Sequence, residues 1–126
     1  MIIEAGVRET SKNGTTLLWE STNTLAFSAQ TVNVDLSQYK VIYITAAINT
    51  ANSSSFKTSM ILNDALLGQQ AIWCGKDNRD AYRMVTVTAS GLEFSNGNVR
   101  TYNSDGTFTT TTSTTVAIPV RIYGGY

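Results

Sequence analysis

The chain has 126 residues, a length that fits one domain with a single core, and its nine basic and nine acidic side chains leave a formal net charge of zero. It contains no histidine and one cysteine, Cys74, so the commonest general base and metal ligand are absent and an intrachain disulfide is excluded. Charged residues amount to only 14% of the chain and form no basic stripe, so nucleic-acid binding is not expected. Because copies of a chain with so little charge repel one another only weakly, self-association is possible.

The first half of the chain predicts an irregular lead-in followed by short strands. Residues 1–15 are expected to form a loose lead-in that ends at an Asn-Gly turn, and residues 16–126 to form the domain. The N-terminus has no basic segment before a long apolar run, so no signal peptide is expected. Apolar and β-branched runs predict strands over residues 17–19, 26–36, 41–48 and 56–62.

Residues 41–48 are apolar on both alternating positions, which predicts a central strand covered on both faces. This is the longest apolar stretch of the chain, and it is too short to cross a membrane. Large aromatic side chains are expected in the core, namely Trp19, Phe27, Tyr43, Phe56 and Phe94.

The second half carries the strongest turn signals. Ser90-Gly91, Asn96-Gly97 and Asp105-Gly106 each lie between strand-like runs, and such pairs favour tight hairpin turns. The pattern predicts strands over residues 71–73, 82–89, 92–95, 98–104, 107–112 and 116–122. Pro119 removes a backbone donor from the last of these, which indicates an edge strand or a break.

About eight or nine short strands, with a turn signal every ten or so residues, are typical of an antiparallel β-sandwich. The expected fold is therefore all-β and jelly-roll-like. Helical periodicity is nearly absent.

A charged segment between two aromatic residues is the main candidate for a ligand site. Aromatic rings stack on the apolar faces of sugars, while carboxylate, amide and guanidinium groups bond their hydroxyls. The alternative is an ordinary solvated loop over residues 75–80. The candidate saccharide-binding residues are Trp73, Lys76, Asp77, Asn78, Arg79, Asp80 and Tyr82.

Catalytic and metal sites have weaker signals. Asp77 and Asp80 form a candidate carboxylate pair for glycoside hydrolysis, and with Asn78 a candidate calcium site, but three-residue spacing on a loop fixes no distance. Cys74 has no histidine to activate it and is expected to be a small buried residue. No phosphate-binding glycine motif is present, so no nucleotide cofactor is indicated. Because histidine is absent and the carboxylate signals are weak, we also expect no metal and no enzymatic activity.

Two segments carry a family resemblance. The segments are Leu17-Leu18-Trp19-Glu20 with residues 25–39, and Ile118-Pro119-Val120-Arg121-Ile122-Tyr123-Gly124. They resemble stretches common in tail fibre and baseplate proteins of phages and prophages of Gram-positive bacteria. Ser28 stands where that pattern has alanine, Gly125-Tyr126 departs from its usual ending, and the middle of the chain diverges.

The resemblance implies a non-enzymatic virion part, a C-terminal head domain that forms homotrimers and adheres to saccharide on the host surface. It would lie in the virion tail, or in the host cytoplasm before assembly. The resemblance locates no binding residue. Two alternatives remain, a purely structural tail or collar module and a polysaccharide hydrolase.

Overall fold

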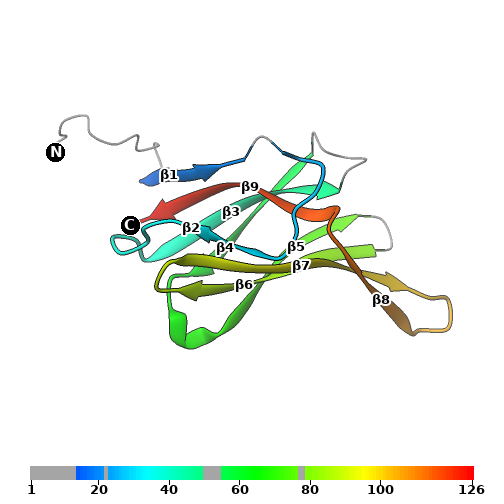
Figure 1. Cartoon of the computed structure of the whole chain (residues 1–126). Helices are drawn as coiled ribbons and strands as arrows, with labels where there is room; N and C mark the ends of the chain where they lie inside the picture. Colours follow the sequence, from blue (N-terminus) through cyan, green and yellow to red (C-terminus); the bar gives the residue numbers. More distant parts are fainter. Residues whose placement is uncertain (1–13, 22, 50–54, 77–78) are drawn as a thin grey trace.

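In the described residues, 14–21, 23–49, 55–76 and 79–126, the computed structural model shows nine strands in two facing sheets (Figure 1). Every paired strand is antiparallel to its neighbour. The predicted all-β sandwich is therefore confirmed. In chain order the strands are β1 (Thr15–Glu20), β2 (Gln30–Asn33), β3 (Val41–Asn49), β4 (Phe56–Leu62), β5 (Gln69–Lys76), β6 (Arg79–Thr88), β7 (Gly91–Tyr102), β8 (Phe108–Ser113) and β9 (Val116–Gly125).

One sheet has the order β1-β9-β3-β4, and the other has the order β2-β7-β6-β5. Strand β8 also pairs with β7, beyond the end of β2, and the β7–β8 hairpin projects from the sandwich in Figure 1. A short 3-10 turn at Ala65–Leu67 joins β4 to β5 and so carries the chain from one sheet to the other.

The core lies between the sheets. Strands with one covered face contribute alternate residues to it, whereas β9 is buried continuously from Val116 to Val120 and β8 has no buried residue. In β6, for example, Ala81, Arg83, Val85 and Val87 are buried, while the residues that alternate with them are only partly covered. Strand β3 contributes Ile42 and Ile44, which are fully buried. This alternation leaves the outer face of each sheet free to carry other side chains.

Arg83 lies in this core and is completely buried, at the position that the alternation of β6 assigns to an apolar residue. Its guanidinium donates to the backbone oxygens of Phe27, Ser95, Val116 and Ala117 at 2.6–2.9 Å. No carboxylate is among these partners. Burial lowers the pKa of Arg83 from 12.5 to about 10, so the group stays charged at neutral pH.

Those four bonds hold irregular backbone in place. Ala117 adopts φ +47°, a value uncommon for a residue with a side chain, and its carbonyl accepts from Arg83 Nε. The β6–β7 register also shifts between Arg83 and Val85, which places a bulge in β7. One buried cation thus satisfies carbonyl groups that a regular ladder would otherwise have paired.

One turn prediction is confirmed, one is displaced by a residue because Gly91 already begins β7, and one is wrong. The chain turns at Ala89-Ser90 and at Asp105-Gly106, but Asn96-Gly97 lies inside β7, next to its bulge. Gly97 is needed there because a Cβ would come within 2.7 Å of Val116 backbone oxygen. The glycine serves close packing rather than a turn.

The strand predicted over residues 26–36 is shorter than expected, because only Gln30–Asn33 pairs with β7. Phe27 is still buried, and its N–H donates to Thr114 outside any sheet. Phe56 was expected in the core but is 42% exposed, because its position in β4 faces outward.

Strand β9 is not an edge strand, since β1 and β3 flank it. The break expected at Pro119 is present, because the β3–β9 register shifts between Thr45 and Ala46, where Pro119 pairs. The lead-in predicted for residues 1–15 ends earlier than expected, with β1 already beginning at Thr15, and residues 1–13 lie outside the described part.

Candidate functional site

The segment expected to be a charged loop is mostly strand. Strand β5 continues to Lys76 and β6 begins at Arg79, so only residues 77 and 78 connect them. The loop reading of residues 75–80 was wrong because Gly75 and Asp80 pair across the two strands. Asp77 and Asn78 lie outside the described residues, and the side chain of Lys76 does too.

Alternation along β6 separates the remaining candidates onto two faces. Asp80 and Tyr82 lie on the outer face, whereas Arg79 shares the inward parity of Ala81 and Arg83. Trp73 pairs directly with Tyr82 across β5 and β6, so it shares the outer face. The structure therefore brings Trp73, Asp80 and Tyr82 together and places Arg79 elsewhere.

Trp73 and Tyr82 form a stacked pair. Their ring centroids are 4.5 Å apart with planes inclined by 33°, as expected for aromatic residues opposite each other on adjacent strands. Strand β5 ends the sheet, so no further strand of that sheet lies beyond Trp73, whose side chain remains 42% exposed.

Arg100 of β7 continues this row of side chains across the sheet. Its guanidinium carbon lies 5.6 Å from the Trp73 ring centroid, 5.7 Å from that of Tyr82 and 4.6 Å from that of Phe108. Contacts of this length are within the range of cation–π attraction. Arg100 Nε is buried without a hydrogen-bond partner.

The carboxylate of Asp80 supplies a hydrogen-bond acceptor beside this row of aromatic and arginine side chains. It pairs in register with Arg100, and its Oδ2 accepts a hydrogen bond from Tyr102 Oη at 2.7 Å. Opposite Asp80 on β5 stands Gly75, which has no side chain to cover the carboxylate. Tyr102 in turn contacts Phe108 edge-to-face, with ring centroids 6.2 Å apart.

We call this set the aromatic–arginine surface. It spans β5 to β8 and combines exposed aromatic area with a cationic donor and a carboxylate acceptor. Trp73, Tyr102 and Phe108 are 42%, 45% and 54% exposed, so ring area is available to a ligand. Its residues are Trp73, Asp80, Tyr82, Arg100, Tyr102 and Phe108.

Sequence reasoning missed Arg100 and Phe108, whereas Tyr102 could be expected from the sequence only as one of several tyrosines that could line an interface or a ligand groove. Their nearest signal was the Asp-Gly turn at residues 105–106, which makes β7 and β8 a hairpin. The register of that hairpin places Arg100 opposite Thr110, whereas the pairing of Arg100 with Asp80 belongs to β6 and β7. The misread Asn96-Gly97 turn interrupted β7, so this second pairing could not be inferred.

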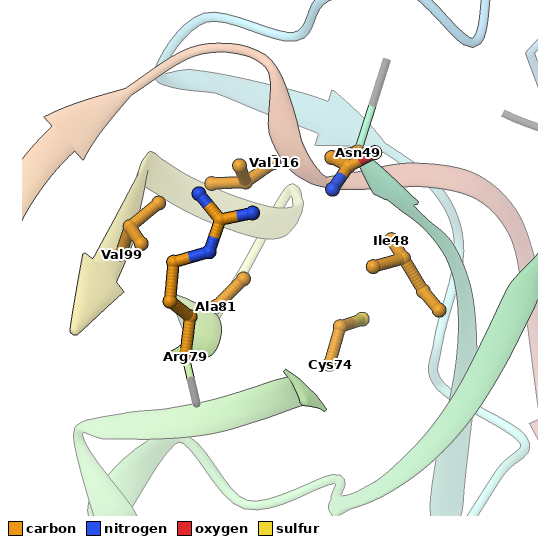
Figure 2. Close-up of a pocket in the computed structure, with 7 residues that line it drawn as sticks. All are labelled: Ile48, Asn49, Cys74, Arg79, Ala81, Val99 and Val116. Carbon is orange, nitrogen blue, oxygen red and sulfur yellow. The ribbon is translucent and has the colours of Figure 1, made fainter. Parts of the chain in front are cut away.

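Arg79 lines a separate hollow at the open end of the sandwich. In Figure 2 its guanidinium extends toward Val116, with Val99 on one side and Asn49 on the other. The cavity beneath holds about 30 Å³, and an open groove of about 470 Å³ adjoins it. Arg79 therefore does not contribute to the aromatic–arginine surface.

Catalytic and metal-binding arrangements have little support in the described residues. Of the candidate carboxylate pair, only Asp80 is described, and its Oδ2 accepts from Tyr102. No three Cys, Asp or Glu side chains of the described residues gather as a metal site would require. Cys74 is 1% exposed in the core, as expected.

Cys74 is expected to resist thiol reagents until the protein unfolds. Burial raises the pKa of its thiol from 9.0 to about 11, which disfavours the reactive thiolate. An unfolded chain would deprotonate near pH 9 and the folded one near pH 11. The contribution of this thiol to stability is therefore present below pH 9 and lost as the pH rises toward 11.

The measurement is labelling by Ellman's reagent, with and without denaturant, together with urea unfolding between pH 8 and pH 11. A Cys74→Ala variant serves as the control, because it should lose this part of the alkaline decline. Rapid labelling of the native protein would contradict the buried placement of the thiol.

No family model, curated protein or solved structure matches this chain. The described residues also include no helix with the length and apolar character needed to cross a membrane.

Proposed function

We propose that the protein is a non-enzymatic adhesion domain that binds saccharide through the aromatic–arginine surface. The observation that carries this proposal is the row of side chains from Trp73 through Tyr82 and Arg100 to Phe108, flanked by the Asp80–Tyr102 hydrogen bond. Sugars need an apolar contact for their C–H faces and both donors and acceptors for their hydroxyls, and this surface supplies all three.

The charges favour a neutral saccharide. Arg100 is a donor and Asp80 an acceptor, and the two residues are directly opposite in register. A ligand carboxylate or phosphate would be attracted by Arg100 but repelled by Asp80 nearby. A hydroxyl can donate to the carboxylate and accept from the guanidinium, so it suits both.

The biological setting follows the resemblance to tail fibre and baseplate proteins of phages and prophages of Gram-positive bacteria. In that setting the domain attaches a virion tail to saccharide of the host envelope, and several copies act together to raise the apparent affinity. The nearly neutral, hydroxyl-rich composition agrees with an exposed adhesive domain.

Replacing Trp73 by alanine is expected to weaken saccharide binding roughly tenfold or more, because about 1.4 kcal/mol of lost stacking corresponds to that factor. The measurement is binding to a glycan array and to isolated Gram-positive cell walls. Arg100→Gln should weaken binding as well, through loss of charged donors.

Phe56→Ala is the matched control. Phe56 has the same 42% exposure as Trp73 and also contacts an arginine, Arg121 at 5.3 Å, but it lies on the other sheet. Equal losses in both variants, or wild-type binding no higher than background, would argue against this site. The second of these outcomes would favour the structural tail or collar module.

A further inference from the structure

Strand β8 is an edge strand without the features that normally prevent edge pairing. Five of its six residues are exposed and the sixth is partly so. It contains four threonines and neither a charged residue nor a proline. Its register with β7 runs without a shift, so no bulge twists the edge away.

The other strands at sheet ends carry such features. Strand β2 has only four residues. Strand β1 has a bulge between Leu17 and Trp19, and β4 carries Lys57 opposite Ala46.

Strand β5 includes a charged residue, Lys76, at its end. It also supplies a side chain, Gln70, that bonds the backbone of β4 at the corner between the two sheets. The Gln70 side chain accepts from the Leu62 N–H at 2.9 Å and donates to its carbonyl at 2.8 Å. Among the described strands at sheet ends, β8 is thus the one with six or more residues that has neither a bulge nor a charged residue.

We propose that β8 is a self-association edge, where two copies of this chain pair β8 against β8 in an antiparallel ladder. A second copy fits because the edge is neutral, so pairing it with itself brings no like charges together. Threonine would face threonine, a favourable cross-strand pair. The zero net charge of the chain adds little repulsion between copies.

This pairing has a consequence for the ligand surface. An antiparallel ladder between identical strands has a two-fold axis perpendicular to the sheet, so the same face of both copies points the same way. Phe108 belongs to β8, and Arg100 and Tyr102 belong to its neighbour β7. The two aromatic–arginine surfaces would adjoin on one continuous sheet face, with a Phe108 from each copy near the seam.

The pairing itself does not depend on saccharide binding, and the experiment uses no ligand. Molar mass is measured by light scattering and sedimentation over a wide range of protein concentration. The test variant is Thr109→Lys with Thr111→Lys, which puts two charges on β8 at positions alternating with Phe108 and so on the opposite face from it. The control is Gln30→Lys with Thr31→Lys, which adds the same charge to exposed residues of β2.

The wild-type mass is expected to rise with concentration toward two protomers, and the β2 variant to behave likewise. The β8 variant should remain at one protomer over the same range. A wild-type mass of one protomer throughout would overturn the proposal. So would an oligomer, of two or three chains, that both variants leave unchanged.

Hydrogen exchange of the wild-type protein gives a readout that does not depend on how the variants fold. Amides of residues 108–113 that point away from β7 should become protected as the concentration rises, whereas amides of β2 should not. Association without added protection in β8 would place the interface elsewhere and overturn the proposal.

Discussion

Replacing Arg83 by methionine is expected to lower the free energy of unfolding by about 3–5 kcal/mol, because each buried acceptor left unpaired costs roughly 1–3 kcal/mol. The side chain is fully buried and bonds four backbone oxygens. Methionine fills a similar volume but donates nothing. Two of the four carbonyls belong to Val116 and Ala117, at the irregular start of β9.

Urea unfolding, followed by intrinsic fluorescence, measures this effect. Arg83→Lys keeps a positive charge but cannot reach four acceptors with its three donors, so most of the loss should persist. Arg121→Met is the matched control, since Arg121 is partly exposed and its ion pair with Glu20, at 3.5 Å, is worth less than about 1 kcal/mol. Equal losses at both positions would contradict the role assigned to the buried guanidinium.

Replacing Gly91 by alanine is expected to cost about 3 kcal/mol or more, as the sum of backbone strain and overpacking, each roughly 1–3 kcal/mol. Gly91 begins β7 with φ +144°, a conformation that residues with side chains rarely adopt. An added Cβ would meet the Val32 carbonyl oxygen and would lie 2.8 Å from Val34 nitrogen. Both atoms are backbone and cannot rotate away.

Gly106→Ala separates the two contributions. Gly106 also has a positive φ, +88°, but no atom lies within 4 Å of the Cβ that would be added. Its loss should be about 1 kcal/mol, from backbone conformation alone. Thermal and urea unfolding of both variants give the comparison, and similar losses would mean that β2 does not press against Gly91 as described.

Local pattern predicted much of the fold. Alternation from Tyr82 to Thr88 correctly identified β6, since a half-buried strand has period two whatever sheet it joins. The turn at Asp105-Gly106 was also readable, because the two residues supply the required backbone angles themselves. Asn96-Gly97 was misread because the same residue pair also suits a bulge, and only the packing of Val116 decides between them.

Only part of the candidate site could be predicted from the sequence, because local pattern groups only residues that are close together along the chain. Trp73, Asp80 and Tyr82 lie close together in the sequence, so a hairpin was enough to group them. Arg100 and Phe108 come from strands that reach the same face through a register shift and a second hairpin. The Asp105-Gly106 turn marks the second hairpin, but the register shift that aligns Arg100 with Asp80 leaves no local trace.

The sequence by itself determined that this protein forms paired strands, has no net charge, is rich in hydroxyl side chains and contains no histidine, because composition and period-two alternation are local properties. Only the tertiary structure decided that Arg83 is a core residue, that Arg79 and Asp80 lie on opposite faces, and that β8 is an open edge. Each of these depends on which strands become neighbours, and contacts between distant segments set that choice.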